Sequence, residues 1–98
     1  MTVELSLAVN GVTIRTDYFV QGFIDHTLSG MVEALEGTGK IRDLDLAIDE
    51  DEVTVNLNGA AVPVNTFASK IIKGTTVGMV SVLKGVKDTK KVNITLRK

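Results

Sequence analysis

The sequence has no cysteine and no tryptophan, and only one proline, one histidine, one tyrosine and three phenylalanines among its 98 residues. Without cysteine the chain forms no disulfide and offers no thiolate as a metal ligand or nucleophile. Aromatic residues make up 4% of the chain, so few side chains are present on which nucleic-acid bases could stack. No apolar run approaches the roughly 18 residues of a membrane helix, and no signal-peptide pattern is present. We therefore expect a cytoplasmic protein without a membrane partner.

The chain contains an internal repeat. When each residue of 3–50 is compared with the residue 48 positions further on, in 51–98, 11 of the 48 pairs are identical. The identities fall where the chemistry of turns and helices constrains the residue type, which favours a duplication over chance. We expect a single domain, residues 1–98, made of two repeats related by a pseudo-twofold axis. The identical pairs are Glu4/Glu52, Asn10/Asn58, Gly11/Gly59, Phe19/Phe67, Ile24/Ile72, Thr27/Thr75, Gly30/Gly78, Met31/Met79, Val32/Val80, Leu35/Leu83 and Gly37/Gly85.

Each repeat begins with the pattern of a β-hairpin. Apolar and polar residues alternate on both sides of Asn10-Gly11, and again on both sides of Asn58-Gly59. Asn-Gly favours a type I′ turn, because both central residues of that turn need a positive φ. Pro63 follows the second of these turns and cannot donate a backbone hydrogen bond, so its strand is expected at an edge of the sheet.

A helical pattern follows each hairpin, with apolar residues every three or four positions over 19–35 and over 67–83. Asp17 and Asn65 occupy equivalent positions and are favourable N-caps. The glycines suited to end the helices are Gly37 and Gly85. The apolar stripes are wide, which indicates that each helix packs on the sheet and on a second surface.

Each repeat closes with an alternating strand, over 44–48 and over 92–96. The order ββαβ-ββαβ predicts an α+β fold, with a mostly antiparallel sheet and both helices on one of its faces. Four matched pairs of side chains are expected to be buried: Val9/Leu57, Phe19/Phe67, Met31/Met79 and Leu35/Leu83.

The sequence offers little catalytic chemistry. His26 stands beside Asp25 and one turn before Ser29, but three residues on one short helical stretch do not converge on a substrate as a nucleophile, base and orienting acid must. The position equivalent to His26 is Gly74, so the repeat does not require the histidine. The acidic run over 43–52 alternates with apolar residues, as in an exposed strand, and lacks the spacing of a calcium loop. We predict a protein that is not an enzyme and holds no cofactor and no metal.

Glycines inside the expected helices need an explanation, since each destabilises a helix by up to about 1 kcal/mol relative to alanine. A close approach of the two helices to each other, or to a helix of a second chain, accounts for them. A ligand that approaches the backbone is the alternative. The residues assigned to such helix contacts are Gly22, His26, Gly30, Gly74 and Gly78.

The two repeats carry opposite charge. Residues 3–50 contain nine acidic and three basic side chains, a net charge of −6, whereas residues 51–98 contain three acidic and eight basic ones, a net charge of +5. Either solubility alone governs these charges, or an acidic half meets a basic half, within one chain or between two. The candidate interaction surface consists of Asp25, Glu33, Glu36, Lys70, Lys73 and Lys84.

These observations together predict a protein-interaction module that self-associates, preferably as a homodimer in which a twofold axis brings acidic and basic halves together twice. A protein partner other than a second copy of the chain is the other form of this prediction. A nucleic-acid-binding domain that uses the basic second repeat is an alternative, although the acidic first repeat would repel phosphate. A carrier of a small apolar ligand, with a pocket between sheet and helices, is the other alternative.

Overall fold

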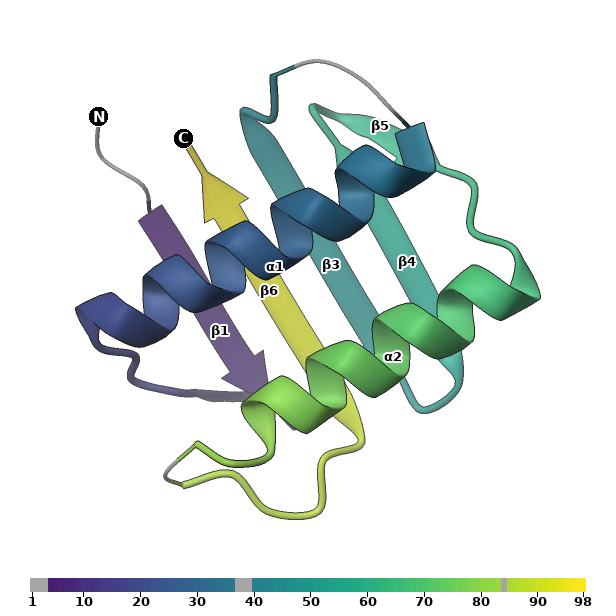
Figure 1. Cartoon of the computed structure of the whole chain (residues 1–98). Helices are drawn as coiled ribbons and strands as arrows, with labels where there is room; N and C mark the ends of the chain where they lie inside the picture. Colours follow the sequence, from purple (N-terminus) through teal and green to yellow (C-terminus); the bar gives the residue numbers. More distant parts are fainter. Residues whose placement is uncertain (1–3, 37–39, 84) are drawn as a thin grey trace.

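The computed structural model describes residues 4–36, 40–83 and 85–98, and of Glu36 only the backbone. Six strands form one antiparallel sheet, and two helices lie on one of its faces, which confirms the predicted α+β fold (Figure 1). The molecule is a flat slab of 34 × 34 × 18 Å with two layers. The elements are β1 (Glu4–Val9), β2 (Val12–Thr13), α1 (Tyr18–Glu36), β3 (Asp43–Asp49), β4 (Glu52–Leu57), β5 (Ala60–Val62), α2 (Thr66–Val80) and β6 (Lys91–Arg97).

The strand order is β2-β1-β6-β3-β4-β5, with β6 and β3 at the centre. Replacing each strand by the strand 48 residues away in the sequence reverses this order, so the two halves of the sheet have the same order when counted from opposite edges. The register follows the same correspondence, because Glu4 lies opposite Arg97 in the β1–β6 pair and Glu52 lies opposite Asp49 in the β3–β4 pair. β5 is an edge strand and Pro63 directly follows it, in agreement with the prediction from the proline.

The two hairpin turns have the predicted geometry. Asn10 and Gly11 have φ values of 52° and 80°, and Asn58 and Gly59 have φ values of 51° and 84°. Two consecutive residues in the left-handed region define a type I′ turn, so this prediction is confirmed at both sites. Each turn continues the right-handed twist of its strands, which keeps the alternating side chains in register.

The first helix agrees with its prediction, but the second is shorter than expected. α1 is one uninterrupted helix, and Asp17 caps it by accepting a hydrogen bond from the backbone N–H of Val20 at 2.8 Å. Asn65 caps α2, but that helix ends at Val80. The prediction that Gly85 ends the second helix is therefore wrong. Serine and β-branched valines follow one another at 80–82, and these residues favour a helix less than alanine or leucine does.

Gly37, the glycine expected to end the first helix, lies outside the described residues. Within the described part of the chain, neither helix is long and apolar enough to span a membrane.

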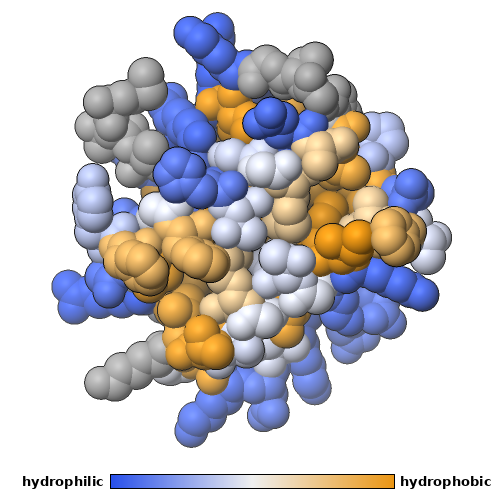
Figure 2. Space-filling model, in the orientation of Figure 1, coloured by the Kyte–Doolittle hydropathy of each residue, from blue (hydrophilic) through white to orange (hydrophobic). Residues whose placement is uncertain are grey.

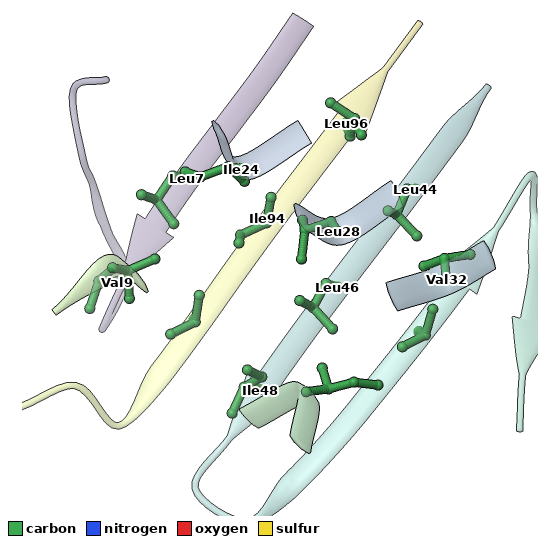
Figure 3. Close-up of a cluster of buried hydrophobic side chains, with 14 of the residues drawn as sticks. Leu7, Val9, Ile24, Leu28, Val32, Leu44, Leu46, Ile48, Ile94 and Leu96 are labelled. Atoms are coloured by element: carbon green, nitrogen blue, oxygen red, sulfur yellow. The ribbon is translucent and has the colours of Figure 1, made fainter. Parts of the chain in front are cut away.

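The hydrophobic core lies between the sheet and the helices (Figure 3). Along the four long strands, every second side chain faces the helices and is buried or half-buried, while its neighbours form the uncovered face of the sheet. Each helix turns one row of residues, spaced by four, toward the sheet. The rows are Ile24, Leu28 and Val32 in α1, and Ile72, Thr76 and Val80 in α2.

The expected burial of Phe19 and Phe67 is wrong, because 75% and 71% of these residues are exposed. A separation of five residues turns Phe19 about 140° around the helix from Ile24, which faces the sheet. The apolar stripe is wider than the surface that the sheet covers. The other expected pairs are buried or half-buried: Val9/Leu57, Met31/Met79 and Leu35/Leu83.

Candidate interaction surface on the helical layer

The outer side of the helical layer carries large apolar side chains that the sheet does not cover. Six of them, here called the outer apolar residues, are between 47% and 93% exposed. Figure 2 shows apolar atoms in two groups on this face, separated by paler atoms. With about 200 Å² for a fully exposed aromatic side chain, the six residues expose on the order of 800 Å². The outer apolar residues are Tyr18, Phe19 and Phe23 of α1, Phe67 and Ile71 of α2, and Val82 beyond α2.

Two hollows lie beside the aromatic residues of α1. The rings of Phe19 and Phe23 are one turn apart, with centroids separated by 6.2 Å, and they form one wall of a hollow of about 250 Å³. Met79, Val82 and Leu83, at and beyond the end of α2, form the opposite wall. A broader depression of about 610 Å³ follows the outward side of α1. Its lining residues are Tyr18, Phe19, Gly22, Phe23, His26 and Thr27.

Among the residues that the structure describes, a cavity between the sheet and the helices measures about 10 Å³. A cavity of that size holds at most one water molecule. Its lining residues are Leu28, Met31, Val32, Leu44, Leu46, Val55 and Ile72.

The helical glycines face open space. A Cβ atom added at Gly22, Gly30, Gly74 or Gly78 would meet no other group within 4 Å. Packing within the chain therefore gives no reason for glycine at these positions, and a close approach of α1 to α2 is not supported. Contact of these glycines with a second chain stays a prediction.

Gly74→Ala and Gly78→Ala should each raise the free energy of unfolding of the monomer by about 0.5–1 kcal/mol, because alanine favours a helix more than glycine does and the added methyl groups meet nothing. Urea denaturation at a low protein concentration would measure the change. The matched control is Gly59→Ala, which has equal space but a φ of 84° and should destabilise the chain. A loss of stability at Gly74 or Gly78 would show that the monomer itself needs these glycines.

Two charged residues of the candidate surface are paired within the chain. Asp25 is 9% exposed; its Oδ1 accepts a hydrogen bond from Ser29 Oγ at 3.1 Å and lies 2.9 Å from Lys98 Nζ. Lys73 Nζ donates to Asp51 at 2.7 Å. Asp25 and Lys73 are thus held by neighbours, whereas Glu33 and Lys70 are exposed. Lys84 and the side chain of Glu36 lie outside the described residues.

The hydrogen bond from Lys73, together with the positive charge of its ammonium group, lowers the pKa of the Asp51 carboxyl. Because the folded pKa lies below the unfolded value of about 4, this pair stabilises the fold above pH 4 and loses its effect as the pH falls through the folded pKa. Asp51 is fully exposed, so solvent screens the contribution.

Opposite charges also meet between the two central strands. Arg97 lies 3.3 Å from Asp43 and 3.2 Å from Asp45, and Lys91 lies 3.9 Å from Asp49. Of the five ion pairs within the described residues, four join an acid of residues 3–50 to a base of residues 51–98. Some of the opposite charges of residues 3–50 and residues 51–98 therefore pair with each other inside one chain.

The residues considered for catalysis separate in the fold. Asp25 and Ser29 contact each other and Lys98, whereas His26 is exposed and lines the broad depression on the outward side of α1. In the ranges that the structure describes, no group of three or more histidine or acidic side chains is arranged to hold a metal ion.

The sequence assigned the candidate surface to charged residues and glycines, and did not identify the outer apolar residues. The available signal was the width of the helical stripes, which exceeds what one sheet can cover. Among known proteins, no family model matches the chain, and neither a curated protein nor a solved structure matches it significantly.

Proposed function

We propose that this protein is a non-enzymatic protein-interaction module that self-associates as a homodimer through the outer side of its helical layer. The main support for this proposal is the large exposed area of the outer apolar residues. This area is divided into two groups on one face, and exposed apolar patches of about 300–600 Å² are often functional. An area on the order of 800 Å² corresponds to one side of a standard protein–protein interface.

A second copy of the chain fits this surface better than an unrelated partner. Each copy brings an apolar area of the same size, and its slab shape leaves the helical layer open over the whole face. The exposed charges on the two helices are complementary, with Glu33 on α1 and Lys70 on α2. Two copies related by a twofold axis bring such charges together twice and form a closed assembly.

We also infer that the chain arose by duplication of a ββαβ unit, with a pseudo-twofold axis between β3 and β6. The matching strand order of the two halves, the matching register and the equivalent buried rows support this origin. The charge reversal fits the same origin. If both repeats had the charges of the first, Asp43 and Asp49 would each oppose an acid across the β3–β6 pair, whereas Arg97 and Lys91 make these pairs attractive.

The alternatives have less support. A nucleic-acid-binding surface needs basic side chains that are free to meet phosphate, but Arg97, Lys91 and Lys98 each lie beside an acid. A carrier of an apolar ligand needs a large cavity between sheet and helices, whereas the cavity that described residues line there measures about 10 Å³. A catalytic triad would need the His26, Asp25 and Ser29 side chains to converge, and His26 lies on the outward side of its helix.

The double substitution Phe19→Ser with Phe23→Ser should raise the dissociation constant of the dimer by at least about 100-fold, since a buried aromatic residue at an interface contributes roughly 2 kcal/mol. Both residues lie on the outer face, so the monomer should keep its stability. Sedimentation velocity over a series of protein concentrations would measure the association.

The matched control is Ser6→Glu with Thr54→Glu, which places two charges on the uncovered face of the sheet. This variant should associate like the natural chain, because its changes lie on the opposite side of the slab. A chain that stays monomeric at high concentration and low salt would reject self-association. Loss of association in the control alone would move the interface to the sheet.

A further inference from the structure

The outward stripe of α2 is bulky in its first half and small in its second half, whereas the stripe of α1 is bulky up to His26 and ends in one small residue, Gly30. In α2 the stripe consists of Phe67, Ile71, Gly74 and Gly78, whose spacings of four, three and four residues keep them within about 60° of one another around the helix. In α1 the equivalent stripe consists of Phe19, Phe23, His26 and Gly30. The bulky residues are exposed, and the space above the glycines is open.

The two helices run in opposite directions across the sheet (Figure 1). The aromatic residues Phe19 and Phe23 of α1 therefore lie beside the end of α2, where they share a hollow with Met79, Val82 and Leu83. When a second copy is turned over about a twofold axis parallel to the helices, α1 of one chain covers α2 of the other. Because this axis preserves positions along the helices, Phe23 of one chain then lies over the end of the partner's α2, where Gly78 leaves open space for its ring.

A twofold axis perpendicular to the helices would also place the first half of each helix on a second half, but α1 would then cover α1 and α2 would cover α2. Charge separates the two arrangements. With α1 over α2, Glu33 of one chain approaches Lys70 of the partner subunit, and this contact occurs twice. With like helices together, Glu33 of one chain and Lys70 of the partner subunit lie at opposite ends of the layer. The electrostatic steering that complementary charges provide is then lost.

From these shapes and charges we infer that two copies dock with α1 of each chain over α2 of the other, so that Phe23 of each chain packs against Gly78 of its partner. The arrangement rests on the self-association proposed above and produces a four-layer sandwich, with the helices inside and the sheets outside. It also gives Gly78 a role, because a small residue lets the facing Phe23 ring approach the backbone.

Complementation between two variants tests this arrangement. Gly78→Leu fills the open space at Gly78, and Phe23→Ala removes the ring that faces it. Each variant alone should weaken its own dimer by at least about tenfold, because both of its contacts are damaged. In the heterodimer that forms in an equimolar mixture, one contact is the natural one between Phe23 and Gly78. In the other contact, the added leucine meets the shortened side chain. The mixture should therefore form a heterodimer within about threefold of the natural affinity.

Native mass spectrometry separates the heterodimer from both homodimers by mass, and urea denaturation verifies that each monomer is folded. The matched comparison pairs Gly78→Leu with Ile71→Ala instead. Rescue by Ile71→Ala and not by Phe23→Ala would establish the arrangement of like helices and overturn ours. Failure of both mixtures, in a chain whose natural form dimerises, would overturn the docking of Phe23 on Gly78 and leave the homodimer standing. A natural chain that never dimerises would reject the proposed function itself.

Discussion

Leu96→Ala should lower the free energy of unfolding by about 3–5 kcal/mol, the upper part of the range for large-to-small changes in a core. Leu96 is completely buried on β6, a central strand, and it lies opposite Leu5 of β1 and Leu44 of β3. Strands on both sides and the helices above hold its surroundings, so the cavity left by the missing methyl groups cannot collapse. Since small domains are stable by about 5–15 kcal/mol, the variant should be close to unfolding.

The matched control for this change is Leu83→Ala, which removes the same atoms from a half-buried position in the turn after α2. We expect a loss of about 1–2 kcal/mol there, because solvent already reaches part of the side chain. Urea unfolding followed by circular dichroism would compare both variants with the natural chain. Equal losses at Leu83 and Leu96 would show that the turn after α2 belongs to the core as fully as the central strand does.

The strands and their turns could be predicted because local sequence determines them. A strand with one covered face permits only one assignment of an alternating pattern, so the burial at 44–48 and 92–96 follows directly from the sequence. The Asn-Gly turns are equally local, since few residues other than asparagine and glycine adopt two consecutive positive φ values. The order of the strands in the sheet depends on contacts between distant segments and could not be deduced in this way.

The helical faces were harder to predict. Periodicity shows that residues 19–35 carry apolar side chains over more than half of the helix surface, but it does not show which part faces the sheet. The sheet covers the row of Ile24, Leu28 and Val32, and the aromatic pair Phe19 and Phe23 remains outside. Large aromatic residues are usual in a core, and that tendency favoured the wrong side of the helix.

The difference in charge between residues 3–50 and residues 51–98 could be read from the sequence, but the ion pairs that these residues form could not. Asp43 and Arg97 are 54 positions apart in the chain and become neighbours only because β3 pairs with β6. Asp25 and Lys98 are likewise brought together by the packing of α1 against the sheet. The sequence left open whether solubility alone governs these charges or an acidic half meets a basic half, and the strand order brings some of the opposite charges together inside one chain.

The two turn asparagines should be the most important polar side chains for stability. Asn10 Oδ1 accepts hydrogen bonds from the backbone N–H groups of Lys90 and Lys91, both at 2.9 Å. Its Nδ2 donates to the backbone oxygens of Lys87 at 3.1 Å and Asp88 at 2.9 Å. One side chain thus fastens the β1–β2 turn to the segment that enters β6.

Asn58 makes the equivalent connection to the segment that enters β3. Its Oδ1 accepts from the backbone N–H groups of Arg42 at 2.8 Å and Asp43 at 3.0 Å, and its Nδ2 donates to the backbone oxygen of Lys40 at 3.0 Å. These hydrogen bonds join segments about 16 and 80 residues apart in the chain, so they connect the hairpins to the two central strands.

Asn10→Ala and Asn58→Ala should each lower the free energy of unfolding by about 2–4 kcal/mol. Each loses several hydrogen bonds worth roughly 1 kcal/mol apiece, partly replaced by water, and each forces alanine into a left-handed conformation that costs about 1–2 kcal/mol. The sites lie in different turns and share no partner, so the double variant should lose about the sum. The control is Asn93→Ala on the uncovered face of β6, where the change should stay within about 0.5 kcal/mol. If Asn10→Ala costs no more than this control, the side-chain connection to β6 contributes nothing, and the strand pairing alone holds the central strands together.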